Sequence, residues 1–184
     1  MEAGELRVGT FIRLEGKIFE IVSFERQKIA QRQPHIKVKM KDIVSGRVID
    51  RTFVSSEKIE SPDISVRLAK FVYKDSNQYV FLDSQSYEEY RFDEKTLEEK
   101  IPWLVEGIDF DIILVDGAAI SVRIPKVMEF EVLETPPGVR GDTESGGIKP
   151  ATLSNGMTIN VPLHIKKGDR IKVNTETKEY AGRA

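Results

Sequence analysis

Short runs in which apolar and polar residues alternate dominate this chain of 184 residues, and long helical periodicity is nearly absent. Glycine, asparagine, aspartate and proline bound these runs, which is typical of small all-β barrels. The one stretch that favours a helix is residues 93–100, where Asp93 can serve as the N-cap and Pro102 stops the helix soon afterwards. The sequence therefore predicts an all-β fold with little helix.

A weak internal repeat points to the number of barrels. Its form is apolar-x-x-Gly-x-x-apolar-x-apolar, and it occurs at residues 6–14, 104–112 and 165–173. Physically it is a tight turn that needs glycine, followed by a strand with one face turned inward. Three copies favour three barrels. Proline-containing junctions near residues 62 and 125 set the predicted domains at 1–61, 62–126 and 127–184.

Charge is unevenly distributed over these three segments. The first contains 12 basic and 9 acidic residues, the second 8 and 13, and the third 8 of each, which gives net charges of +3, −5 and 0. A segment with a net charge of −5 is repelled by phosphate. Any nucleic-acid surface is therefore expected on the outer two segments.

The most basic stretch runs from Arg26 to Lys41 and contains six lysines or arginines, one histidine and no acid. Strands are expected around residues 18–24 and 36–40, so that residues 26–35 form the turn of a hairpin. Three lysines would then point outward from the second strand, at Lys37, Lys39 and Lys41. This arrangement suits a phosphate-rich partner. Two other interpretations stay open, an edge strand whose lysines prevent aggregation and an acidic protein partner.

Residues 135–152 form the other unusual stretch, with four glycines and three prolines between two strands. Long loops in small domains are either flexible connectors or binding elements, and the sequence leaves both open. Arg140 and Lys149 flank the glycines, whose backbone N–H groups could approach a phosphate or a base closely.

Catalytic patterns are absent from the sequence. There is no cysteine, and the two histidines, His35 and His164, fall in different predicted domains, so we expect no metal site. Nucleophile, phosphate-loop and dinucleotide motifs are missing, and we expect neither enzymatic activity nor a cofactor or small-molecule substrate. No apolar run is long enough for a membrane span and no secretory signal is visible, which leads us to expect a cytoplasmic protein.

The C-terminal third carries a specific family resemblance. The pattern Lys149-Pro150-Ala151-x4-Gly156-x2-Ile159-x-Val161-Pro162-x2-Ile165-x2-Gly168 resembles the signature of bacterial elongation factor P. Residues 137–143 and the ending at residues 179–183 extend the resemblance, and shorter matches upstream spread it over the whole chain.

This resemblance implies a fold and a function. The fold would be three small barrels in an elongated, tRNA-like arrangement, an SH3-like (KOW-related) domain followed by two oligonucleotide-binding (OB) folds. The protein would bind the ribosome between the peptidyl and exit sites as a monomer. Its hairpin tip would reach the acceptor end of the peptidyl-tRNA and promote peptide-bond formation at polyproline stalls.

The resemblance also assigns site residues. The tip would contain Lys28, Gln31 and Arg32, and Gln31 stands where the family usually has a modifiable lysine or arginine. Because glutamine cannot take those modifications, the sequence favours an unmodified tip, with Arg32 as the alternative modified residue. Further contacts would be Lys37, Lys39 and Lys41 to RNA phosphates, Gly141, Asp142 and Thr143 to the exit-site codon, and Tyr180 and Arg183 to small-subunit RNA.

Two alternative functions follow from the same residues. The unusual tip is compatible with a paralogue that binds ribosomes without relieving stalls. Barrels of the oligonucleotide-binding type would also suit a general RNA-binding or chaperone protein. The acidic middle segment argues against this last reading, because it suits a spacer better than an RNA platform.

Overall fold

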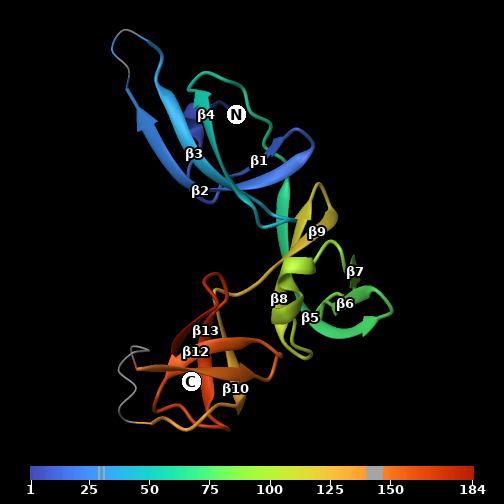
Figure 1. Cartoon of the computed structure of the whole chain (residues 1–184). Helices are drawn as coiled ribbons and strands as arrows, with labels where there is room; N and C mark the ends of the chain where they lie inside the picture. The colour runs from blue at the N-terminus through green and yellow to red at the C-terminus, as the bar shows by residue number, and fades with distance from the viewer. Residues whose placement is uncertain (29, 31, 140–146) are drawn as a thin grey trace.

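The computed structural model of the chain describes residues 1–28, 30, 32–139 and 147–184. Within these ranges the chain forms three antiparallel sheets and two short 3-10 helices, which confirms the all-β fold. Figure 1 shows the sheets following one another in an elongated arrangement, with the first and the third at opposite ends.

The first sheet has the order β1-β2-β3-β4, from β1 (Phe11–Leu14), β2 (Lys17–Gln27), β3 (His35–Asp42) and β4 (Val48–Val54). The helix η1 (Ala3–Glu5) precedes it and bonds to the chain just after β4. Ile36, Val38 and Met40 of β3 are at most 1% exposed, as the alternating pattern predicts. Because β3 lies between β2 and β4, the interpretation of its lysines as edge-strand protection is wrong.

The second sheet has the order β7-β6-β5-β8-β9, and its strands are β5 (Ile64–Asp75), β6 (Gln78–Leu82), β7 (Glu89–Asp93), β8 (Asp109–Val115) and β9 (Ala118–Arg123). Asp116 and Gly117 join β8 to β9 with φ angles of 49° and 84°, both positive as a tight hairpin turn requires.

The helix expected at residues 93–100 is wrong in its bounds and in its type. The structure has instead a 3-10 helix, η2 (Glu98–Trp103). Asp93 ends β7, and its carboxylate accepts a hydrogen bond from Gln78 across the sheet instead of capping a helix. With three residues per turn, η2 places Leu97, Lys100 and Trp103 on one side. Leu97 and Trp103 are buried there, so tertiary packing determines this segment.

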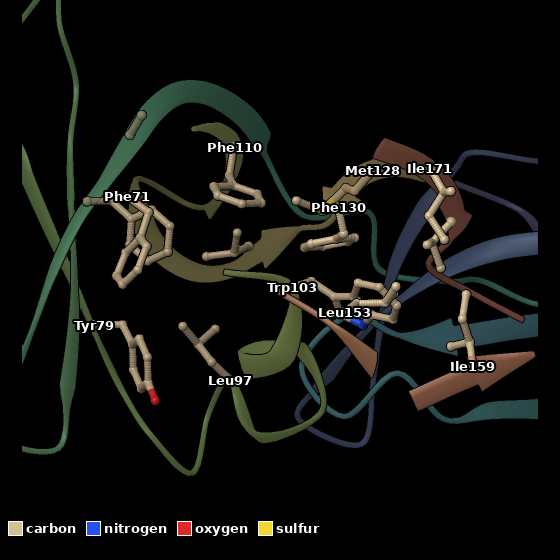
Figure 2. Close-up of a cluster of buried hydrophobic side chains, with 14 of the residues drawn as sticks. Phe71, Tyr79, Leu97, Trp103, Phe110, Met128, Phe130, Leu153, Ile159 and Ile171 are labelled. Atoms are coloured by element: carbon tan, nitrogen blue, oxygen red, sulfur yellow. The ribbon is translucent and has the colours of Figure 1, made fainter. Parts of the chain in front are cut away.

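The third sheet has the order β12-β11-β10-β13-β14, and its strands are β10 (Val127–Glu134), β11 (Ile148–Leu153), β12 (Thr158–Pro162), β13 (Arg170–Asn174) and β14 (Glu179–Arg183). One cluster of buried side chains joins the second and third sheets. At its centre the rings of Trp103 and Phe130 lie 5.9 Å apart (Figure 2). The first sheet has a core of its own, which includes Ile12, Ile21 and Phe53.

The glycine repeat found in the sequence adopts the same local structure three times. Gly9, Gly107 and Gly168 have φ angles of 90°, 83° and 89°. Their backbone N–H groups each donate a hydrogen bond of 2.8 Å to a strand carbonyl. The acceptors are Ile21, Phe71 and Val132, respectively. Each acceptor lies at a register shift of its strand. The predicted turn is therefore a glycine turn that docks on a β-bulge in each sheet.

A second repeated turn was not recognised in the sequence. The side-chain oxygens of Asp42, Asp83 and Asn174 each accept hydrogen bonds from the backbone N–H groups two and three residues later, at 2.8–3.2 Å. In Asp83 these bonds lower the pKa of the carboxyl group. In Asp42 burial raises the pKa, but the same bonds outweigh burial and the net shift is downward. The turns join β3 to β4, β6 to β7 and β13 to β14.

Candidate functional site

The β2–β3 hairpin is the most prominent projection from the first sheet (Figure 1). The two strands pair from Phe19 opposite Asp42 as far as Gln27 opposite His35, so the predicted hairpin is present and its strands are longer than expected. Of the predicted tip residues, Lys28 and Arg32 are exposed. Gln31 lies outside the described residues.

The base of the tip is fixed to the end of β4. The carbonyl of Pro34 accepts a hydrogen bond from the Ser55 N–H at 2.9 Å. The hydroxyl of Ser56 donates to the Gln33 side chain at 2.6 Å. These bonds hold the C-terminal side of the loop, so that the tip is presented from a fixed support.

The predicted lysines lie on one face of the hairpin, but they are not alone there. Lys37 and Lys39 are exposed and Lys41 is half-buried. Cross-strand register places Glu25 opposite Lys37, Asp50 opposite Lys39 and Glu20 opposite Lys41. Directly opposed residues of an antiparallel pair share a face. Three ammonium groups and three carboxylates therefore share this face, and their charges sum to zero.

The junction between the first and second sheets sets the direction in which the hairpin projects. An apolar contact joins Ile18 and Ile43 to Ile113 and Val115. At its exposed rim Arg13 forms ion pairs with Asp116 and, at 2.5 Å, with Glu60. The hydrogen bond to Arg13 lowers the pKa of Asp116.

Lys100, the last residue of the helix expected from the sequence, lies in this junction. The Lys100 ammonium donates to the carbonyls of Ile43 at 3.0 Å and Val122 at 2.6 Å, and to the hydroxyl of Ser121 at 2.5 Å. That hydroxyl donates in turn to Ile43 at 2.7 Å. Desolvation, with a smaller contribution from the positive charge of Lys41, lowers the pKa of Lys100 to about 8. No local sequence signal distinguishes this lysine from exposed ones.

The glycine-rich loop of the third sheet can be described only at its two ends. The predicted contacts Gly141, Asp142 and Thr143 lie outside the described residues. On the N-terminal side, Thr135 donates to the carbonyl of Pro150 at 2.9 Å. Lys149 is 7% exposed, and its ammonium donates to the carbonyl of Pro136 at 2.7 Å. Lys149 thus anchors the start of the loop to β11, and its ammonium group is directed at the Pro136 carbonyl and not at solvent.

Gly138 in the same segment lies against the chain after β12. A Cβ atom at this position would come within 2.4 Å of the Leu163 carbonyl oxygen. Only glycine allows this approach without a shift of the backbone. The start of the loop is therefore fixed against the sheet.

The last predicted contacts lie on β14, at the opposite end of the molecule from the hairpin (Figure 1). Tyr180 is half-buried and packs against the large apolar cluster. Arg183 is exposed and pairs with Asp169 at 3.2 Å, which uses one nitrogen of its guanidinium group. Of the predicted site residues that the structure describes, Lys28, Arg32 and the three lysines belong to the hairpin of the first sheet, and Tyr180 and Arg183 lie on the third sheet.

The residues that the structure describes contain neither a candidate metal-binding cluster nor a helix that could span a bilayer. In that part of the chain no group of three or more histidine, cysteine, aspartate or glutamate side chains is placed to hold a metal ion. No helix there is long and apolar enough to cross a bilayer.

Comparison with known proteins matches three family descriptions in succession. They are "Elongation factor P (EF-P) KOW-like domain" at residues 2–59, "Elongation factor P (EF-P) OB domain" at residues 64–122 and "Elongation factor P, C-terminal" at residues 128–183. Individual relatives agree with this result. The chain is 39% identical over 184 residues to elongation factor P of Fervidobacterium nodosum, with 100% of both chains covered. It is 40% identical over 181 residues to elongation factor P of Caldanaerobacter subterraneus subsp. tengcongensis, with 98% of both covered.

Among solved structures, the fold is similar to that of a protein described as "Eukaryotic translation initiation factor 5A from Methanococcus jannaschii". The TM-score is 0.52 at 22% identity, over 67% of this chain and 92% of the other. This likeness concerns the fold alone.

Proposed function

The chain belongs to the elongation factor P family of translation elongation factors, and we propose that it binds the ribosome between the peptidyl and exit sites and stimulates peptide-bond formation at polyproline stalls. The observation that supports this most is the succession of three elongation factor P matches from residue 2 to residue 183. The three units of this proposal are residues 1–61, 62–126 and 127–184. The protein acts in the cytoplasm as a monomer, because a site the size of a tRNA holds one copy.

The mechanism is positional and involves no bond-making by the protein. The hairpin tip, with Lys28 and Arg32, lies beside the acceptor end of the peptidyl-tRNA and stabilises a reactive geometry. Prolyl nitrogen is a poor and conformationally restricted nucleophile, so holding the reactants in place lowers an entropic barrier. The attachment of the tip to β4 through Pro34 and Gln33 supports this role, because a fixed support limits the motion of the loop.

The other predicted contacts complete the docking. Lys37, Lys39 and Lys41 are candidate contacts to RNA phosphates near the tip. On the third sheet, Tyr180 and Arg183 contact small-subunit RNA, and Gly141, Asp142 and Thr143 approach the exit-site codon. The strand β14, which carries Tyr180 and Arg183, lies at the opposite end of the molecule from the hairpin, as contacts along a site of the length of a tRNA would require (Figure 1).

A reconstituted translation system programmed with a triple-proline reporter tests the proposal. Adding the protein should increase full-length product, and Arg32→Ala should remove most of this increase while ribosome binding is largely retained. Arg47→Ala is the matched control, because Arg47 is exposed in the turn between β3 and β4, at the end of β3 away from the tip. Equal loss of rescue and of binding in Arg32→Ala would contradict the tip assignment. Intact-mass measurement of the native protein tests the unmodified tip.

Glutamine at position 31 favours a second candidate function. A protein without the usual modifiable residue could bind ribosomes as a paralogue that does not relieve stalls. In that case the same reporter would show no increase in full-length product, although the protein co-sediments with ribosomes.

A further inference from the structure

The face of the hairpin opposite the lysines packs on the core of the first sheet, and the side chains exposed at its edges have a different charge balance. On this face the register aligns Phe24, Val38 and Arg51 in one row, and Arg26, Ile36 and Phe53 in the next. Neither row contains a carboxylate, whereas each of the three lysines on the other face has one beside it. Arg26 and Arg51 are both exposed.

A third arginine reaches this face from the segment after η1. The guanidinium carbon of Arg7 lies 5.5 Å from the centre of the Phe24 ring. On the same face the guanidinium carbon of Arg51 lies 5.9 Å from the centre of the Phe53 ring. Within the described ranges, none of Arg7, Arg26 and Arg51 forms an ion pair. We call these three residues the arginine face.

The local contacts pre-orient two of these groups. One nitrogen of Arg7 donates to the carbonyls of Leu6 at 2.6 Å and Gly4 at 3.3 Å, which leaves its other nitrogens available. Stacking on an aromatic ring holds a planar guanidinium group, so that less conformational freedom is lost when it binds. A guanidinium fork also matches the two oxygens of a phosphate, which an ammonium group does not.

We propose that the arginine face binds the phosphate backbone of the peptidyl-tRNA and supplies more of the first unit's RNA affinity than Lys37, Lys39 and Lys41 do. This inference rests on the proposed function, which places the hairpin tip at the acceptor end of that tRNA. Three exposed guanidinium groups with no carboxylate in their rows lie beside the strands that lead to the tip. Their positive charge is complementary to the RNA backbone. Among the described residues Lys37, Lys39 and Lys41 form no ion pair either, but a carboxylate lies opposite each of them, so this face has no net charge and we expect it to release fewer counterions.

The test compares two triple variants of the full-length protein. One changes Arg7, Arg26 and Arg51 to glutamine, and the other changes Lys37, Lys39 and Lys41 to glutamine. Binding is measured at several salt concentrations, by fluorescence anisotropy of labelled protein, to ribosomes with and without peptidyl-tRNA in the peptidyl site. The arginine variant should lose more than about tenfold in affinity for the loaded ribosomes, and its salt slope should fall by roughly 2 to 3. The lysine variant should change both quantities less.

Because Arg7 and Arg51 pack on core aromatics, their replacement could weaken the first sheet. Arg26→Gln alone avoids this problem, since Arg26 lies over no aromatic ring of the described residues, and it should lower the salt slope by about one. Retention of the wild-type slope in Arg26→Gln would overturn the inference. An equal or larger effect of the lysine variant would also overturn it.

Comparing ribosomes with and without peptidyl-tRNA distinguishes phosphates of the peptidyl-tRNA from those of ribosomal RNA. Loss of affinity for loaded ribosomes only supports the peptidyl-tRNA, whereas equal loss for loaded and empty ribosomes assigns the contact to ribosomal RNA and overturns the proposal. If the wild-type protein binds ribosomes and relieves stalls, and the arginine variant has the same affinity and salt slope, only the inference about the arginine face fails. If wild-type protein does not bind ribosomes at all, the proposed function fails and the inference with it.

Discussion

Lys100 offers a quantitative test of the junction between the first and second sheets. Its ammonium group donates to two carbonyls and to the Ser121 hydroxyl, and burial is the largest cause that lowers its pKa to about 8 from the usual 10.5. Lys41 and Arg123 lower the pKa further, and Asp42 opposes them. We consider the substitution Lys100→Met, which keeps a long side chain and removes the titrating group.

The sign of the pH effect follows from the two pKa values. Between about pH 8 and pH 10.5 the unfolded chain still holds a proton on Lys100 that the folded chain has released. The free energy of unfolding of the wild type therefore rises with pH in this window. Below pH 8 both states are protonated, and the full desolvation cost of the ammonium group is present. At about 1.4 kcal/mol per unit of pKa shift, the increase from pH 7 to pH 9.5 is about 2 kcal/mol.

Urea unfolding followed by the fluorescence of Trp103, the one tryptophan of the chain, measures this difference. Trp103 lies in η2 together with Lys100, so its signal reports on the relevant segment. The wild type should gain about 2 kcal/mol relative to Lys100→Met between about pH 7 and pH 9.5. Lys95→Met, at an exposed lysine shortly before η2, should follow the wild type. If the free energies of unfolding of the wild type and of Lys100→Met changed in parallel with pH, the reasoning would be refuted.

Three further predictions concern packing and surface charge. Gly138→Ala should lower the free energy of unfolding by about 1–3 kcal/mol, because the new methyl group meets the Leu163 carbonyl; hydrogen exchange should show the loosening at this loop first. Met40→Ala should cost about 2–5 kcal/mol in urea unfolding, since Met40 is 0% exposed, whereas the neighbouring exposed Lys39→Ala should cost less than about 0.5 kcal/mol. Arg13→Gln should change the stability measured in this way by less than about 1 kcal/mol, because its ion pairs are solvent-exposed; a larger loss would mean that the rim holds the junction together.

Local sequence patterns were sufficient for the buried face of the basic hairpin and for the glycine turns, but not for the turns at Asp42, Asp83 and Asn174. Alternation with a period of two placed Ile36, Val38 and Met40 in the core because successive side chains of a strand point to opposite faces. The repeated glycine was predictable as a turn because a positive φ angle is accessible to glycine at little cost. The resemblance to elongation factor P followed from residue patterns alone, and comparison with known proteins confirmed it.

Residues 93–100 show where local patterns stopped being informative. Asp93 before a charged, helix-compatible stretch satisfied the rules for an N-cap, yet Asp93 pairs with the neighbouring strand and the helix begins at Glu98. Burying Leu97 and Trp103 on one side of a short segment requires a tighter helix than the α-helix that the stretch favours by itself. Packing against the sheet outweighed intrinsic preference.

The sequence by itself determined which residues share a face of each strand, and hence the barrels, the basic hairpin and the family. Only the tertiary structure decided which residues of neighbouring strands lie opposite one another. Cross-strand register, and not the order of residues, places Glu25, Asp50 and Glu20 beside the three lysines and leaves the arginine face without a carboxylate in its rows. The low pKa of Lys100 has the same origin, since its neighbours Ile43 and Ser121 are 57 and 21 residues away along the chain. Electrostatic interactions depend on distance in space, and folding alone sets that distance.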